Sequence, residues 1–429
     1  MSDILLIFPP IWDVFSPYTS IPYLSSFLKN KGIKIKVWDA NIEIYDKMIT
    51  DRYLEKMLGK IEKKLSKSDQ RKIHREKLLK NFELGKFMLG RVDELKQTLR
   101  KVSDRSSMIR SKNMLSSMHS IITGEDEWPQ YKSTIQTITQ LYKAVKETQH
   151  NPYYPFLESY VENKFETMCK LNNFSGKLVG FSVTGTSQLV NSILLARLIK
   201  TKRPEIKVVI GGAAIPYLQE VILSMEKLPE IDFIVTGEGE TALYRLLETY
   251  QNTEQLKKVP NLIYLDSSGK YKLTDDKFME NIEEFAVPDY GQLPLEKYFC
   301  THGMLSYVSS RGCHWNKCTF CALNCNYGNK YRARSVDKTV EDLLYLKKNY
   351  DLHYLYFNDE AFPPKRLWDL SHKMIEANLN LKWLASLRME KGFSKRHFNI
   401  AYQAGLRMIA FGAESGAQET LELMGKGTQ

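Results

Sequence analysis

Three cysteines stand close together in the second half of the chain, at Cys313, Cys318 and Cys321. They follow an apolar run, Met304 to Ser309, that is typical of a buried strand. Iron–sulfur clusters are held by closely spaced cysteine thiolates, and a cluster with three protein ligands leaves one iron open for another molecule. A fourth cysteine, Cys325, leaves a closed structural zinc site as the alternative on spacing alone.

The pattern after the cysteines favours the open cluster. Helical patterns at 336–350 and around 367–377 alternate with strand-like runs that end near residues 360, 388 and 416. Strands that alternate with helices indicate parallel βα units, and a barrel of such units carries its site at the C-terminal strand ends. Polar side chains occupy these expected strand ends, namely Asp359, Glu360, Arg388 and Glu414. A zinc site would not need this series.

On these residues, the segment from Met304 to Thr428 resembles the radical S-adenosylmethionine enzymes. The matching features, in order, are the cysteine loop, Tyr331–Ser335 leading into a helix, and the strand ends Asn358–Glu360, Ser386–Arg388 and Gly412–Gly416. The chain departs from the usual family pattern at one point, because four residues rather than three separate the first two cysteines.

This resemblance implies that the three cysteines hold a [4Fe–4S] cluster and that S-adenosylmethionine chelates its open iron. An electron, delivered by a donor such as flavodoxin or ferredoxin, would then produce a 5′-deoxyadenosyl radical that abstracts hydrogen. The resemblance also implies S-adenosylmethionine contacts from Phe320, Asp359, Glu360, Ser386, Arg388 and Glu414. The structural alternatives are ion pairs, of Arg388 with Glu390 and of Glu414 with Arg407.

A second α/β pattern precedes the cysteines. Strand-like runs occur at 4–10, 33–38, 178–182, 208–212 and 233–240, with helical patterns near 21–31, 188–202 and up to 247. This order predicts a doubly wound, Rossmann-like sheet with small residues directly after three strands. Glycines at such positions let the backbone approach a bulky ligand closely.

This pattern resembles the cobalamin-binding domain commonly fused in front of radical S-adenosylmethionine barrels. The matching segments are Phe8–Pro10, Gly180–Gln188, Ile210–Ala213 and Thr236–Thr241. The resemblance implies a cobalamin site made of Phe8, Pro9, Ser182, Thr184, Thr186, Gln188, Gly211, Gly212, Gly237 and Glu238. Because Ile11–Phe15 contains no histidine, we do not expect a histidine ligand to cobalt. A domain that binds nothing and only supports the barrel is the alternative.

The predicted organisation has four parts. We expect residues 1–48 and 173–280 to form the cobalamin-binding domain, 49–172 a helical insertion, 281–297 a linker, and 298–429 a partial barrel. Helical spacing of Leu54, Met57, Ile61 and Leu65 supports the insertion. Its basic runs at 71–77 and 100–101 contribute to the net charge of +11 and are interpreted as solvated helix faces. No motif typical of nucleic-acid binding accompanies them.

Composition favours a cytoplasmic enzyme. The 429 residues are 43% hydrophobic, contain no apolar run of membrane-spanning length, and begin without the pattern of an export signal. Six cysteines, three of them in one loop, argue against a disulfide framework. Because radical S-adenosylmethionine barrels continue beyond the fourth strand, the resemblance implies a chain truncated at its C-terminus.

The expected function is a cobalamin-dependent radical methyltransferase that acts on an unactivated carbon of a peptide or another natural product. A radical cyclase or rearrangement enzyme that uses cobalamin is the alternative within the same class. A truncated, inactive fragment that binds cofactors is the alternative outside it. The substrate itself is not identified by any pattern in the chain.

Overall fold

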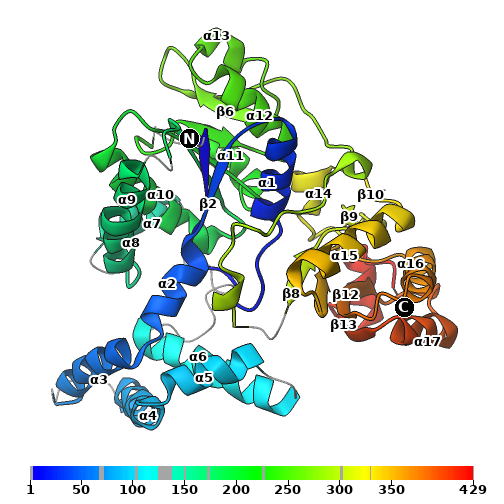
Figure 1. Cartoon of the computed structure of the whole chain (residues 1–429), viewed down its shortest axis with the longest axis horizontal. Coiled ribbons are helices and arrows are strands. Elements are labelled where there is room, and N and C mark those ends of the chain that lie inside the picture. The colour runs from blue at the N-terminus through cyan, green and yellow to red at the C-terminus, as the bar shows by residue number, and fades with distance from the viewer. Residues whose placement is uncertain are drawn as a thin grey trace.

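The computed structural model describes residues 3–66, 72–101, 105–123, 138–148, 151–171, 174–224, 228–299, 303–328 and 330–428. These residues form two α/β units, each on its own sheet, and a group of helices that projects away from the first unit (Figure 1). The predicted α/β class with parallel strands is confirmed.

The first sheet has seven strands in the order β2-β1-β3-β4-β5-β6-β7. These strands are β1 (Ile4–Phe8), β2 (Ile35–Asp39), β3 (Leu178–Ser182), β4 (Lys207–Gly211), β5 (Phe233–Val235), β6 (Leu262–Leu265) and β7 (Tyr271–Leu273). The first five are parallel, whereas β6 and β7 are antiparallel and were not predicted. The strand order reverses between β1 and β3, which is where doubly wound sheets bind their ligands.

The central strand β1 contributes to two cores. Leu5 and Ile7 lie in the core that includes α10 (Thr186–Lys202), and Leu6 and Phe8 lie in the core that includes α1 (Ser20–Asn30) and α12 (Glu240–Thr249). All five β1 residues are buried, as expected for a parallel strand covered on both faces. The remaining helices of this unit are α2 (Ala40–Met48), α11 (Gln219–Ser224) and α13 (Thr253–Leu256).

The inserted segment is helical where it is described. Its helices are α3 (Asp51–Leu65), α4 (Lys72–Met88), α5 (Val92–Lys101), α6 (Arg105–Thr123), α7 (Ile138–Lys146), α8 (Tyr154–Tyr160) and α9 (Glu166–Lys170). The first four project from the molecule, whereas α7 and α8 pack on α10 (Figure 1). Arg71, at the start of one basic run, lies outside the described residues. No helix in the described ranges combines the length and apolar character needed to cross a membrane.

The second sheet has four parallel strands in the order β13-β12-β11-β8. They are β8 (Met304–Tyr307), β11 (Tyr354–Phe357), β12 (Lys382–Arg388) and β13 (Leu406–Gly412), and the helices are α15 (Val336–Tyr350), α16 (Pro364–Glu376), α17 (Lys395–Gln403) and α18 (Gln418–Leu423). In the described residues β8 and β13 do not pair with each other, so the sheet is open. The predicted barrel is therefore not confirmed.

The two units are in direct contact. The segment between them passes through short 3₁₀ turns at Ile282–Glu284 and Leu295–Lys297. The Tyr23 hydroxyl donates to the Val308 carbonyl at 2.8 Å, and the Phe299 amide donates to the Val14 carbonyl at 2.9 Å. A short ribbon of β9 (Ser310–Arg311) and β10 (Arg332–Ala333), with α14 (Leu323–Tyr327) between them, faces the first sheet (Figure 1).

Candidate functional site

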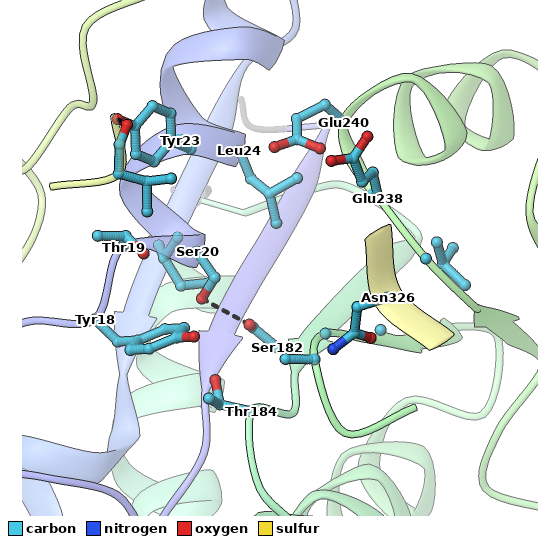
Figure 2. A pocket seen from close by; sticks show the side chains of 18 of the residues that line it. Tyr18, Thr19, Ser20, Tyr23, Leu24, Ser182, Thr184, Glu238, Glu240 and Asn326 are labelled. Atoms are coloured by element: carbon cyan, nitrogen blue, oxygen red, sulfur yellow. Dashed lines mark hydrogen bonds between the residues drawn. The ribbon is translucent and has the colours of Figure 1, made fainter. Parts of the chain in front are cut away.

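A cavity lies between the C-terminal edge of the first sheet and the beginning of the second unit. One wall comes from α1 and the ends of β3, β4 and β5, and the other from the residues after β8 and β11 and from α14. Figure 2 shows Tyr18, Ser20, Ser182 and Thr184 gathered on the first wall, with the Ser182 hydroxyl donating to Ser20 at 2.7 Å. Asn326 of α14 also lines the cavity.

Bare backbone forms much of the cavity floor, because Gly211, Gly212 and Gly237 line it. Gly212 has a φ of 114°, and a Cβ there would lie 2.5 Å from the Val183 carbonyl oxygen, so only glycine is accommodated. A floor without side chains lets a broad ligand approach the strand ends. The geometry therefore fits the bulky cofactor that the sequence implies.

Six of the ten residues predicted to contact cobalamin line this cavity, namely Ser182, Thr184, Gly211, Gly212, Gly237 and Glu238. Four do not, namely Phe8, Pro9, Thr186 and Gln188. The Gln188 side chain is buried, accepts from the Thr184 amide at 2.7 Å, and donates to the Pro9 carbonyl at 2.7 Å. Gln188 thus links the loop after β1 to the loop after β3. No histidine is among the described lining residues.

The cysteine loop connects β9 to α14. The Thr319 amide donates to the Met424 carbonyl at 2.9 Å, and the Trp315 indole donates to the Gly425 carbonyl at 2.8 Å. Burial raises the pKa of the Cys321 thiol, and the nearby Cys318 and Cys313 thiolates raise it further. All three cysteines thus belong to one short loop, with Cys318 and Cys313 near Cys321.

The fourth cysteine of the loop differs from the other three in its surroundings. Cys313, Cys318 and Cys321 are partly buried. Structural zinc requires four ligands around one ion, and the fourth cysteine, Cys325, is exposed. In a [4Fe–4S] cluster the thiolates are spread over several irons, so convergence on one point is not needed.

The two acidic residues after β11 have different surroundings. The Asp359 carboxylate is buried and accepts from the Ser309 amide at 2.9 Å, the Ser309 hydroxyl at 2.7 Å, and the Ser310 hydroxyl. Glu360 instead lines the cavity. The Glu360 side chain is exposed at the cavity, but partial loss of water around its carboxyl, with the adjacent Asp359 charge, raises the pKa of Glu360 to about 7. Of the two, Glu360 is the carboxylate available to a ligand.

We predict that Asp359→Ala lowers the free energy of unfolding by about 3 kcal/mol or more. The change leaves the Ser309 and Ser310 donors without their acceptor, and each unpaired buried donor costs about 1–3 kcal/mol. Urea denaturation measures the effect. Asp369→Ala, which removes a solvent-facing ion pair with Lys365, is the control and should cost less than about 1 kcal/mol. Equal losses in the two variants would refute this role.

Of the remaining residues predicted for S-adenosylmethionine, Arg388 contacts the cysteine loop and Phe320 is part of it. The Arg388 guanidinium lies 3.8 Å from the Cys318 Sγ, 3.6 Å from Glu390, and over the Trp315 ring. Glu414 pairs with Lys426 at 2.9 Å, not with Arg407, the partner considered from the sequence. Phe320 is 51% exposed, with the Lys426 ammonium 5.9 Å from its ring. The Ser386 carbonyl accepts from the Phe362 amide at 3.1 Å.

Several cavity residues were missed from the sequence. They are Tyr18, Ser20, Glu240, Arg311, Tyr327 and Asn358. Tyr18 lies in an irregular loop after β1, where no periodicity indicates the direction of a side chain. Glu240 lies within the recognised segment Thr236–Thr241 and Arg311 lies two residues before Cys313, and these positions were the available signal.

Comparison with known proteins agrees with this site. Residues 156–247 match the family model described as the B12 binding domain. This range contains β3, β4 and β5, whose ends provide the glycine floor of the cavity. The predicted likeness of the first unit to cobalamin-binding domains is confirmed.

Two curated relatives cover similar parts of the chain. An uncharacterized methyltransferase of Pyrococcus horikoshii is 29% identical over 260 residues, which are 60% of this chain and 56% of that protein. The anaerobic magnesium-protoporphyrin IX monomethyl ester cyclase of Synechocystis sp. is 24% identical over 55% of this chain and 47% of its own length. The chain thus spans about half the length of these relatives.

A solved structure extends the comparison to nearly the whole chain. The radical S-adenosylmethionine methyltransferase TsrM from Kitasatospora setae, with cobalamin and a [4Fe–4S] cluster bound, aligns with a TM-score of 0.56. The alignment covers 98% of this chain and 62% of that one at 14% identity, so it establishes likeness of fold. Together with the B12-binding match, it confirms that the chain resembles the cobalamin-dependent radical S-adenosylmethionine enzymes.

Proposed function

We propose that this chain binds cobalamin, a [4Fe–4S] cluster and S-adenosylmethionine, and that it serves a radical methyl transfer to an unactivated carbon. The observation that carries the proposal is the shared cavity, which joins the glycine floor of the B12-binding sheet to the strand ends beside the cysteine loop. A single cavity bounded by both units suits a reaction in which two cofactors act on one substrate.

Different groups of residues are proposed to bind the three cofactors. Cys313, Cys318 and Cys321 would hold the cluster, and the glycine floor with Ser182 and Thr184 would hold cobalamin. Glu360 would bind the cationic groups of S-adenosylmethionine, and Ser386, Arg388, Glu414 and Phe320 are proposed as further contacts at the cysteine loop. When bound, the cofactors supply electron transfer and a transferable methyl group, which protein side chains lack. The protein positions them and excludes water.

The proposed partners follow from this chemistry. The substrate would be a peptide or another natural product with an unactivated carbon, and the electron would come from a donor such as flavodoxin or ferredoxin. Ring formation in place of methyl transfer is the second candidate, supported by the similarity to the cyclase of Synechocystis. The products separate the two, because only methyl transfer moves a labelled methyl group from S-adenosylmethionine to the substrate.

The proposal is tested on protein reconstituted anaerobically with iron and sulfide. We expect it to bind hydroxocobalamin and, with a reductant, to form 5′-deoxyadenosine from S-adenosylmethionine. Protein that takes up zinc but no cluster, or that binds no cobalamin, would contradict the proposal.

A pH dependence of S-adenosylmethionine binding is predicted from Glu360. Its pKa of about 7 lies above that of an ordinary glutamate, so the carboxyl is mostly neutral at pH 6 and mostly ionised at pH 7.5. Attraction for a cationic ligand is therefore present above pH 7 and lost as the pH falls. We expect the affinity of the reconstituted protein for S-adenosylmethionine to rise about fivefold from pH 6 to pH 7.5. Calorimetric titration measures it.

Glu360→Gln should remove this rise, whereas the exposed Glu376→Gln should retain it. A rise of the same size in Glu360→Gln would show that another group titrates.

A further inference from the structure

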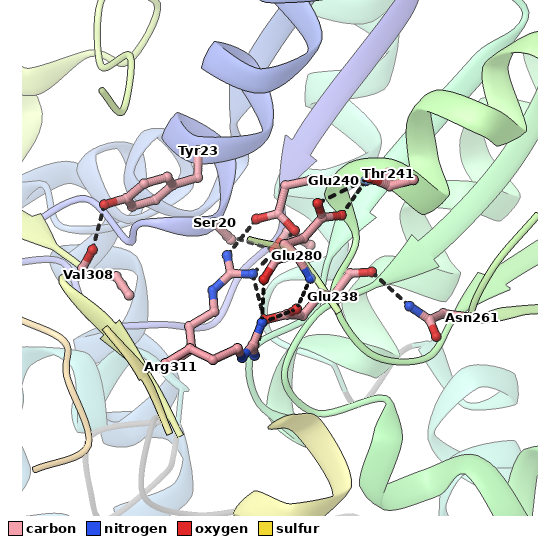
Figure 3. A network of polar contacts seen from close by, with 11 residues as sticks. Ser20, Tyr23, Glu238, Glu240, Thr241, Asn261, Glu280, Val308 and Arg311 are labelled. Atoms are coloured by element: carbon pink, nitrogen blue, oxygen red, sulfur yellow. Dashed lines mark hydrogen bonds and ion pairs between the residues drawn. The ribbon is translucent and has the colours of Figure 1, made fainter. Parts of the chain in front are cut away.

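Four charged side chains join the two units at the edge of the cavity. Glu238 and Glu240 follow β5 of the first sheet and face Arg311 of β9 (Figure 3). Arg332 lies on β10, which pairs with β9. Arg311 lies 2.9 Å and Arg332 lies 2.7 Å from the Glu238 carboxylate, and Arg311 also binds Glu240. We call this group the clamp.

The clamp is buried, unlike an ordinary surface ion pair. Side-chain exposure is 2% for Glu238, 5% for Glu240, 12% for Arg311 and 17% for Arg332. Burial alone would raise the pKa of Glu238. The hydrogen bond from Arg332 and the charge of Arg311 outweigh this effect and hold the pKa of Glu238 below its usual value. Removing one partner of a buried ion pair leaves the other charge without compensation, so each of these side chains depends on the others.

The clamp also stands at the base of the cysteine loop. Arg311 precedes Cys313 by two residues, and its strand pairs with that of Arg332. Gly312, which lies between Arg311 and Cys313, has a φ of 84°. A Cβ at this position would lie 2.3 Å from the Lys330 carbonyl oxygen. Arg311 and Cys313 are therefore joined by a single residue that is packed against the backbone of Lys330.

The clamp is at the same time part of the cavity wall, since Glu238, Glu240 and Arg311 line it. We propose that the clamp couples occupancy of the cavity to the order of the cysteine loop, with Glu238, Glu240 and Arg311 acting as positioning residues. The coupling rests on the proposed function, in which cobalamin occupies the cavity. A ligand that packs against the closed clamp binds that state more tightly than an open one, and so it stabilises the loop.

Hydrogen exchange on the cluster-free, full-length chain tests the coupling with hydroxocobalamin as the probe. Saturating probe should slow amide exchange in peptides covering 182–190, which include Ser182 and Thr184 of the cavity wall, and in peptides covering 310–323. We expect the slowing at 310–323 to be about fivefold or more, the lower range of typical coupling energies.

Two clamp variants and one control isolate the effect. Arg311→Lys keeps the positive charge but loses the planar guanidinium group that binds both Glu238 and Glu240. Glu240→Gln removes one of these two carboxylates. Both should lose the slowing at 310–323 at a probe concentration that saturates the variant itself, as established by its own titration. Arg197→Lys alters an ion pair with buried Glu230, 2.8 Å away on the first unit, and should keep both effects.

The outcomes separate the two proposals. Slowing at 182–190 without slowing at 310–323 in the unaltered chain overturns the coupling and leaves the cobalamin site standing. Slowing at 310–323 that persists in both clamp variants shows that the clamp does not carry it, which also overturns the proposal. Failure of the unaltered chain to bind hydroxocobalamin overturns the proposed function and the coupling with it.

Discussion

Replacing Cys313, Cys318 and Cys321 together by alanine is expected to abolish iron and sulfide uptake and all cleavage of S-adenosylmethionine. These three thiols lie in one loop beside the cavity, between the lining residues Arg311 and Asn326. Without thiolate ligands no cluster is retained, and no electron reaches the sulfonium. Iron and sulfide analysis, the visible absorption spectrum and a 5′-deoxyadenosine assay on anaerobically reconstituted protein measure the loss.

Cys325→Ala is the matched control, because this exposed cysteine is only four residues beyond Cys321. It should keep nearly all of the iron and the cleavage activity. Loss of the cluster in this single variant would assign a ligand role to Cys325 and contradict the site described above. Purification with one tightly bound zinc in place of iron would revive the structural zinc alternative.

The second large effect is expected from filling the cavity. Gly239 lines the cavity and has ordinary backbone angles. A Cβ added at Gly239 would have one neighbour within 4 Å, the Leu24 Cδ2 atom at 3.8 Å. Gly239→Phe should therefore fold normally while its ring occupies the space of a ligand. We expect hydroxocobalamin affinity to fall at least about tenfold, or about 1.4 kcal/mol, in an anaerobic titration followed by absorption.

Gly59→Phe is the control, because Gly59 lies on α3 with no atom within 4 Å of an added Cβ. It should leave the affinity unchanged. In the unaltered chain the bound cofactor should lack the spectrum of histidine-ligated cobalt, since the described cavity lining contains no histidine. Unchanged affinity in Gly239→Phe would place the cofactor elsewhere.

Much of the α/β framework could be predicted from sequence, because buried parallel strands and amphipathic helices have strong patterns. The helix predicted at 336–350 spans Val336–Tyr350, and the strand predicted at 178–182 spans Leu178–Ser182. The short antiparallel strands β6 and β7, of four and three residues, were missed because such runs carry too few residues to show alternation.

The directions of polar side chains were harder to predict. Asp359 and Glu360 are adjacent, yet one is bound by two serines and the other faces the cavity. Neighbouring residues at a strand end point to opposite sides, and the sequence does not say which side holds the ligand. The clamp was missed for another reason, because Arg311 and Glu238 are 73 residues apart and meet only through the packing of two units.

The central claim is that one cavity places cobalamin beside the cluster held by the cysteine loop. Electron paramagnetic resonance of the reconstituted chain tests it most directly, by recording the cob(II)alamin signal with the cluster oxidised and then reduced. We predict that reduction of the cluster broadens the cobalt signal and speeds its relaxation, because the two spins are close. An unchanged cobalt signal, in protein that holds both cofactors in full, would show that they occupy separate sites and would contradict the account.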